Sequence, residues 1–139
     1  MIRVTVWNEF QHERTQEKVK EIYPDGIHTC IAKFLGQEEE LSVRTAVFDE
    51  KEHGLTEEVL ANTDVLVFWN HMLQEEFSDD VAERVRRHVL AGMGLVVLHS
   101  GHYSKIMRKL LGTSMTLRWR HGDRELSLIH ISEPTRPER

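Results

Sequence analysis

The segments Asp64-Val-Leu-Val-Phe-Trp69 and Gly94-Leu-Val-Val-Leu-His99 are two short, continuous apolar runs. Such runs are typical of parallel strands that are buried on both faces, because helices cover both sides of a parallel sheet. Between them, Ser78-Asp-Asp80 predicts the start of a helix with apolar residues at helical spacing, and Gly92 predicts its end. The two runs therefore predict central strands of a parallel sheet, joined by a helical crossover.

The alternation of strand and helix continues on both sides of these runs. β-branched and apolar patterns predict strands at residues 2–7, 41–48, 64–69 and 94–99, with a short extra strand at residues 115–119. Apolar residues at helical spacing predict helices at residues 27–35, 56–60, 78–91 and 104–111, while the polar residues 8–14 predict a loop. The expected fold class is α/β, with an open, mostly parallel sheet and helices on both faces.

Composition bounds the size of the protein and the partners that it takes. The chain has 139 residues, of which 40% are hydrophobic and 29% are charged, which is the balance of one globular domain. Its net charge of -5 argues against binding to nucleic acid or to an anionic membrane, since both require basic patches. One cysteine cannot form an internal disulfide, and residues 1–14 hold no apolar run of signal-peptide length. We therefore expect a cytoplasmic protein.

The placement of the histidines suggests a functional site. Ligands of open parallel sheets bind beyond the carboxyl ends of the strands, an edge that we call the carboxyl rim. The residues that follow the predicted strands are mostly polar and include five of the nine histidines: Asn8, Glu9, His12, Glu13, Asp49, Glu50, His53, Asn70, His71, His99, Ser100, Gly101 and His102. This clustering predicts a small-molecule site at the carboxyl rim.

Three of these histidines are candidate ligands of a divalent metal, with zinc as the first choice. His12, His71 and His102 would supply imidazole nitrogens, and Glu9 would act as a carboxylate ligand or as a base. Their spacing matches no strong zinc motif, so the fold has to bring them together. The alternatives are hydrogen bonds from these side chains to a substrate, or structural roles in which His12 and His53 are solvated loop residues.

The turn His99-Ser-Gly101 follows a strand at the place where several α/β hydrolytic folds carry a nucleophile. A serine elbow of the form G-x-S-x-G requires glycine at positions 98 and 102, where this chain has Leu98 and His102. The single cysteine, Cys30, lies in a predicted helix about 70 residues earlier. We therefore predict no serine or cysteine nucleophile at this turn, and we assign His99 as a general acid or base.

Four further residues at the carboxyl rim are predicted to bind the substrate. Trp69 ends a strand, and its ring can stack on the face of a sugar, although a structural role at the sheet edge is as common. The other three are chosen because they directly follow strands, and they are Asn8, Ser100 and Gly101. The predicted catalytic residues beside them are Glu9 and His99.

Several motifs along the chain resemble those of one family in a single register. They are Val4-Thr-Val-Trp-Asn-Glu-Phe10, Tyr23-Pro-Asp-Gly-Ile-His28, His53-Gly-Leu-Thr-Glu-Glu-Val59, residues 61–72, and Gly92-Met-Gly-Leu-Val-Val-Leu-His-Ser-Gly-His102. On these motifs the chain resembles the ThuA family of trehalose-utilization proteins over residues 1 to about 125. The resemblance implies a flavodoxin-like fold similar to that of class I glutamine amidotransferases. It also implies a role in the use of trehalose or a related disaccharide, beside a sugar dehydrogenase that makes keto-sugars.

The resemblance also separates two hypotheses about function. The amidotransferase relatives carry a cysteine at the elbow, whereas this chain has His99 there, so their thiol chemistry is not implied. The leading hypothesis is a protein that binds or transforms a disaccharide or its keto derivative at the carboxyl rim. The alternative is a non-catalytic carbohydrate-binding or regulatory protein that keeps an amidotransferase-like fold without the cysteine.

The end of the chain departs from the family. Residues 126–136, Leu-Ser-Leu-Ile-His-Ile-Ser-Glu-Pro-Thr-Arg, resemble one reading frame of a transposase sequencing adapter. We therefore expect residues 1–125 to be the N-terminal part of a ThuA-like domain and residues 126–139 to be a non-native tail. The sheet would then be incomplete at its C-terminal end, and its uncovered apolar edge would favour association into a homo-oligomer.

Overall fold

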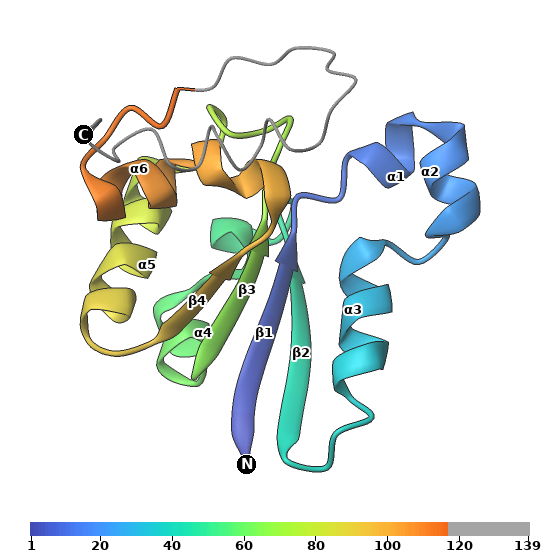
Figure 1. The fold of residues 1–139 in the computed structure, drawn as a ribbon, viewed down its shortest axis with the longest axis horizontal. Helices are drawn as coiled ribbons and strands as arrows, with labels where there is room; N and C mark the ends of the chain where they lie inside the picture. Colours follow the sequence, from blue (N-terminus) through green and yellow to red (C-terminus); the bar gives the residue numbers. More distant parts are fainter. Residues whose placement is uncertain (117–139) are drawn as a thin grey trace, which may run out of the picture.

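The computed structural model describes residues 1–116 and shows an α/β fold built on a parallel sheet (Figure 1). The four strands are β1 (Ile2–Asn8), β2 (Leu41–Val47), β3 (Val65–Trp69) and β4 (Gly94–Val97). The α-helices are α1 (His12–Thr15), α2 (Glu17–Ile22), α3 (Ile27–Leu35), α4 (Glu57–Ala61), α5 (Asp79–Leu90) and α6 (Lys105–Leu111). Two short 3-10 helices, η1 (Lys51–Gly54) and η2 (His99–Tyr103), follow β2 and β4. The predicted fold class is confirmed.

The strand order fixes the place where a ligand site is expected. The strands lie in the order β2-β1-β3-β4, and every pair is parallel. The chain passes from β1 to β2 on one side and then to β3 on the other side of β1, so the order reverses between β1 and β3. In an open parallel sheet, the carboxyl ends of the strands at such a reversal flank a crevice. Asn8 and Trp69 are register partners at this point.

Helices cover both faces of the sheet, as the apolar pattern predicts. Figure 1 shows α3 beside β1 and β2, with α5 and α6 on the other side of the molecule. The larger core lies against α5 and contains Trp7, Leu66, Phe68, Phe77, Val81, Val85 and Ile106. The smaller core lies against α3 and contains Val4, Val6 and Val67, with Ile31 and Leu35 packed on it. Alternate residues of β1 and β3 therefore serve opposite cores, which is the period of a strand buried on both faces.

Side-chain caps begin the helices on the α5 side. The hydroxyl oxygens of Ser78 and Ser104 accept hydrogen bonds from the backbone two or three residues inside α5 and α6. Thr56 caps α4 in the same way, with 3.2 Å between its Oγ1 and the Val59 nitrogen. These caps satisfy backbone N–H groups that have no partner inside the helix. The predicted starts of α4 and α5 are therefore confirmed.

The structure corrects two details of the sequence prediction. The predicted loop at residues 8–14 contains α1, which begins at His12. The run from Gly94 was predicted to be a central strand, buried on both faces, but within residues 1–116 β4 is the edge strand and Val96 is 47% exposed. The same apolar sequence can form a central strand or an edge strand. The position is decided by which strands pair with it, and the sequence of the run does not show this. The extra strand at residues 115–119 and the boundary at residues 125 and 126 lie outside the described residues.

The amino end of β3 is tied to β1 and β4 through Asp64. Its carboxylate accepts hydrogen bonds from the backbone nitrogen, Nε and NH2 of Arg3, at 2.8 to 2.9 Å. Its backbone nitrogen donates to Arg3 O and its carbonyl accepts from the nitrogen of Gly94. The hydrogen bonds from Arg3 hold the pKa of Asp64 well below its usual range.

No helix within the described part of the chain has the length and apolar character needed to cross a membrane.

A depressed pKa at Asp64 makes a prediction about stability and pH. We expect Asp64→Asn to lower the free energy of unfolding at pH 7, because Arg3 donates hydrogen bonds to the ionised carboxylate in the folded chain and not in the unfolded chain. This advantage is complete above the aspartate pKa of the unfolded chain, about 3.9, and declines as the pH falls below it. Urea unfolding of both proteins between pH 7 and pH 3 measures the difference. A difference that grows on acidification would contradict the assignment.

Candidate functional site

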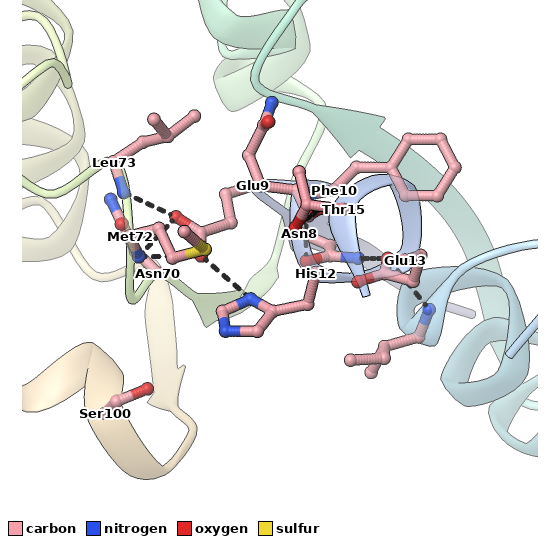
Figure 2. A network of polar contacts seen from close by, with 12 residues as sticks. Asn8, Glu9, Phe10, His12, Glu13, Thr15, Asn70, Met72, Leu73 and Ser100 are labelled. Carbon is pink, nitrogen blue, oxygen red and sulfur yellow. Dashed lines mark hydrogen bonds and ion pairs between the residues drawn. The ribbon is translucent and has the colours of Figure 1, made fainter. Parts of the chain in front are cut away.

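Glu9 is a buried carboxylate at the carboxyl end of β1. Its side chain is completely buried, although a charged group in such a position is costly without partners. The partners are backbone N–H groups of the turn that follows β3: Met72 donates to both carboxylate oxygens at 2.9 and 3.0 Å, and Leu73 donates to Oε2 at 2.9 Å. Figure 2 shows these bonds crossing from β1 to the turn after β3. Glu9 therefore fixes the position of that turn.

His12 lies three residues after Glu9, at the start of α1. Its Nδ1 is 3.6 Å from Glu9 Oε1, which is an ion-pair distance but too long for a hydrogen bond. Nδ1 is buried and has no hydrogen-bond partner within residues 1–116, while the whole side chain is 15% exposed. A buried carboxylate beside an imidazole is the arrangement that orients a histidine for proton transfer.

Three aromatic rings form a wall beside this pair, and we call His12, Trp69 and His71 the aromatic wall. The His12 ring lies 5.1 Å from the Trp69 ring and 5.2 Å from the His71 ring, centroid to centroid. The rings of Trp69 and His71 are stacked, nearly parallel at 16°, with centroids 6.3 Å apart. His71 is exposed, so part of the wall faces solvent. Flat rings at a polar rim can pack against the apolar face of a sugar.

Asn8 takes part in an internal network on the α3 side of β1. Its Nδ2 donates to Glu13 Oε2 at 2.7 Å and lies 3.1 Å from His28 Nδ1, and its Oδ1 accepts from the nitrogen of Phe10. Asn8 is 1% exposed, so both ends of its amide are used inside the protein. Burial lowers the pKa of His28 below its usual value. The sequence prediction placed His28 only in a helix, because nothing in the chain signals its contact with Asn8.

The turn after β4 begins the 3-10 helix η2 and carries an imidazole, His99, at its first position. His99 has φ of 39°, in the left-handed region that favours glycine. Ser100 and Gly101 are buried, and a Cβ on Gly101 would lie 2.7 Å from Val97 Cγ1. Only glycine therefore fits at position 101.

The predicted site residues fall into two groups. Glu9, His12, Trp69 and His71 lie together at the reversal between β1 and β3. His99, Ser100, Gly101 and His102 lie on η2, where His102 Nδ1 is 2.9 Å from the carbonyl of His99. Among the described residues, no hydrogen bond, ion pair or ring contact joins the two groups, and Figure 2 shows Ser100 apart from Glu9 and His12.

The metal assignment stays a prediction. Within residues 1–116, no three histidine, cysteine, aspartate or glutamate side chains converge closely enough to hold a metal ion. The rings of His12 and His71 are neighbours, with centroids 5.2 Å apart. Nδ1 of His102 lies 2.9 Å from the His99 carbonyl.

His53 has a structural place that differs from a solvated loop residue. Its ring stacks between Phe48 and Phe77, with centroids at 4.2 and 4.8 Å. Its Nδ1 lies 2.9 Å from the Phe48 carbonyl, and Nε2 accepts a hydrogen bond from the nitrogen of Ser78 at 3.0 Å. Since Nε2 is the acceptor, Nδ1 carries the proton that Phe48 O accepts. The solvated-loop alternative for His53 is therefore wrong, because two aromatic rings enclose it.

The sequence matches one known protein family. The model of the ThuA family, described as trehalose utilisation, matches residues 3–136. The chain belongs to the ThuA family. A comparison with curated proteins found no significant match. In this ThuA-family chain, the acid–imidazole pair and the aromatic wall stand where a sheet of this strand order binds ligands.

The contrast between two rim histidines gives a test of the structure. We expect His53→Ala to lower the free energy of unfolding by about 2 kcal/mol, because it removes a stacked ring and leaves the Ser78 N–H without its partner. His71→Ala removes an exposed ring, so its effect is expected to stay within about 0.5 kcal/mol. Urea unfolding monitored by circular dichroism measures both values. Equal losses in the two variants would contradict the assigned roles.

Proposed function

We propose that this ThuA-family protein binds trehalose, a related disaccharide or its keto derivative at the carboxyl ends of β1 and β3, and that His12 transfers a proton there. The observation that carries the proposal is the Glu9–His12 pair, with 3.6 Å between Oε1 and Nδ1. The family description, trehalose utilisation, supports a carbohydrate as the ligand.

The roles of the two residues differ in this proposal. Both oxygens of Glu9 accept backbone hydrogen bonds, so Glu9 acts as a positioning residue through His12. Nδ1 of His12 makes no hydrogen bond among the described residues, so this nitrogen has no competing partner. His12 then accepts or donates the proton, either at a sugar hydroxyl or at a carbon beside a keto group.

The aromatic wall would hold the sugar against this pair. Trp69 and His71 are stacked aromatic rings at the rim, and a pyranose has an apolar face of C–H groups that packs on such rings. The sugar would lie between this wall and η2, which carries His99, Ser100 and Gly101.

Substitution of His12 tests the proposal. We expect His12→Ala to reduce turnover of trehalose or 3-keto-trehalose by at least about 100-fold, the usual contribution of a general acid or base. Trehalose affinity should change much less. Glu9→Gln should lower kcat more than it raises KM, because it acts by orienting His12. His88→Ala is the matched control, since His88 on α5 pairs with Glu57 on α4 and lies outside the rim. Unchanged turnover in the His12 variant would contradict the proposed role.

A second candidate function is that of a non-catalytic carbohydrate-binding or regulatory protein. The observation that favours it is His99, an imidazole at the elbow where the amidotransferase-like enzymes carry a cysteine. Saturable trehalose binding without turnover of either sugar would support this function over the enzymatic one.

Zinc binding remains part of the proposal. The rings of His12 and His71 have centroids 5.2 Å apart, and Glu9 Oε1 lies 3.6 Å from Nδ1 of His12, so an ion would have to draw these side chains and His102 together. We expect His71→Ala to lower the zinc content of protein purified in the presence of zinc. His102→Ala should lower it as well, because a hydrogen bond from Nδ1 of His102 to the His99 carbonyl leaves Nε2 to bind the ion. Inductively coupled plasma analysis measures the metal, and equal zinc in the native chain and the His71 variant would contradict the assignment.

The pathway assignment completes the proposal. A sugar dehydrogenase in the cytoplasm would supply the keto-sugar, since a protein that acts beside a keto group needs an enzyme that oxidises a hydroxyl first. A homo-oligomer is proposed from the edge position of β4 and the exposed Val96 on it.

A further inference from the structure

Asn70 is a buried amide whose polar atoms have no partner. It directly follows β3 and is completely buried. Neither Nδ2 nor Oδ1 makes a hydrogen bond within the part of the chain that the structure describes. A primary amide offers two donors and an acceptor, and burying it without partners opposes folding. An apolar side chain of this size would avoid that cost, so the amide calls for a partner other than the described residues.

The backbone around Asn70 is held in place on three sides. Its carbonyl accepts a hydrogen bond from Gln74 Nε2 at 3.3 Å, and the same Nε2 also donates to the carbonyl of Ser100. The two residues after His71 donate to Glu9. A Cβ on Gly101 would lie 3.7 Å from the nitrogen of Asn70, so η2 packs closely against this end of β3. Asn70 therefore lies between the Glu9–His12 pair and η2, and it has little freedom to turn elsewhere (Figure 2).

We propose that Asn70 is a positioning residue of the ligand site, whose amide donates to and accepts from one hydroxyl group of a neutral sugar. This inference rests on the proposed function. A hydroxyl group is both a donor and an acceptor, so one hydroxyl can satisfy both ends of the amide. In the absence of sugar, a water molecule would take the same place and be displaced on binding.

The charge beside Asn70 selects the class of sugar. The carboxylate of Glu9 is completely buried at the end of the neighbouring strand β1. Its charge would repel a phosphate group in a low-dielectric setting. Neither Lys nor Arg contacts Glu9, Asn70 or His71 among the described residues. The site therefore favours an unphosphorylated disaccharide over a sugar phosphate.

The experiment compares two variants of Asn70 with matched variants of Asn62. Asn70→Leu removes every polar atom, and Asn70→Asp removes the two donors at constant size. Asn62 is exposed near the amino end of β3, where it bonds to Arg3 and to the Glu58 carbonyl, so N62L and N62D are controls. Calorimetric titration with trehalose and with trehalose 6-phosphate gives affinities, and thermal unfolding gives Tm.

The expected result separates binding from stability. N70L and N70D should bind trehalose at least tenfold more weakly than the native chain, while N62L and N62D bind it equally well. N70L should keep or raise the Tm, because it removes an unpartnered amide. The native chain should bind trehalose at least tenfold more tightly than trehalose 6-phosphate.

Each contrary outcome has one meaning. Native affinity for trehalose in N70L overturns the inference. If N70L binds trehalose normally and also has a lower Tm, the amide of Asn70 bonds to an internal water and not to the sugar. If N70L fails to fold, N70D decides, and native affinity in N70D overturns the inference. Tighter binding of the phosphate overturns the sugar class. A native chain that binds no trehalose overturns the proposed function together with this inference, whereas intact binding in N70L overturns the inference alone.

Discussion

The buried carboxylate of Glu9 organises the carboxyl end of this sheet. A charge with no solvent access has to be compensated inside the protein, and the nearest donors are the backbone N–H groups of Met72 and Leu73. Meeting that demand draws the turn after β3 toward the end of β1. The same contacts place His71 beside His12 and bury Asn70 behind them. One electrostatic requirement thus sets the positions of the residues that form the candidate site.

The opposite end of the same two strands is held by a different charge pair. Asp64 binds Arg3 through both its carboxylate and its backbone, and it also contacts the first residue of β4. The strands β1 and β3 are therefore tied at both ends, with an apolar core on each face between the ties. A scaffold that is rigid in this way suits a site whose geometry depends on a few tenths of an ångström. The proposed site lies at the reversal between β1 and β3, where His12 would transfer the proton.

The turn after β4 is held in a tightly packed conformation by its backbone and by a glycine. His99 holds a left-handed backbone, and Gly101 allows η2 to pack on the end of β3. This packing contributes to the burial of Asn70 and closes one side of the rim. In the ThuA-family chain the turn thus has a structural use that does not depend on a nucleophile.

The sequence by itself determined the fold class, the two apolar strand runs, the caps at Thr56 and Ser78, and the family. These features are local, because strand periodicity, helix caps and motifs each depend on a few neighbouring residues. It also placed Glu9, His12, Trp69 and His71 at one rim, since parallel strands end on the same side of a sheet.

Only the tertiary structure decided what each of these residues contacts. Glu9 is 63 positions from Met72 in the chain, and no pattern marks their hydrogen bond. The ring stack around His53, the contact of Asn8 with His28, and the edge position of β4 likewise depend on partners far away in sequence. Similar polar residues at the ends of strands therefore took different roles: His53 stacks between two phenylalanine rings, whereas His12 lies beside a carboxylate at the rim. The physical reason is that burial and hydrogen bonding are properties of packed surfaces, which exist only after the strands and helices have come together.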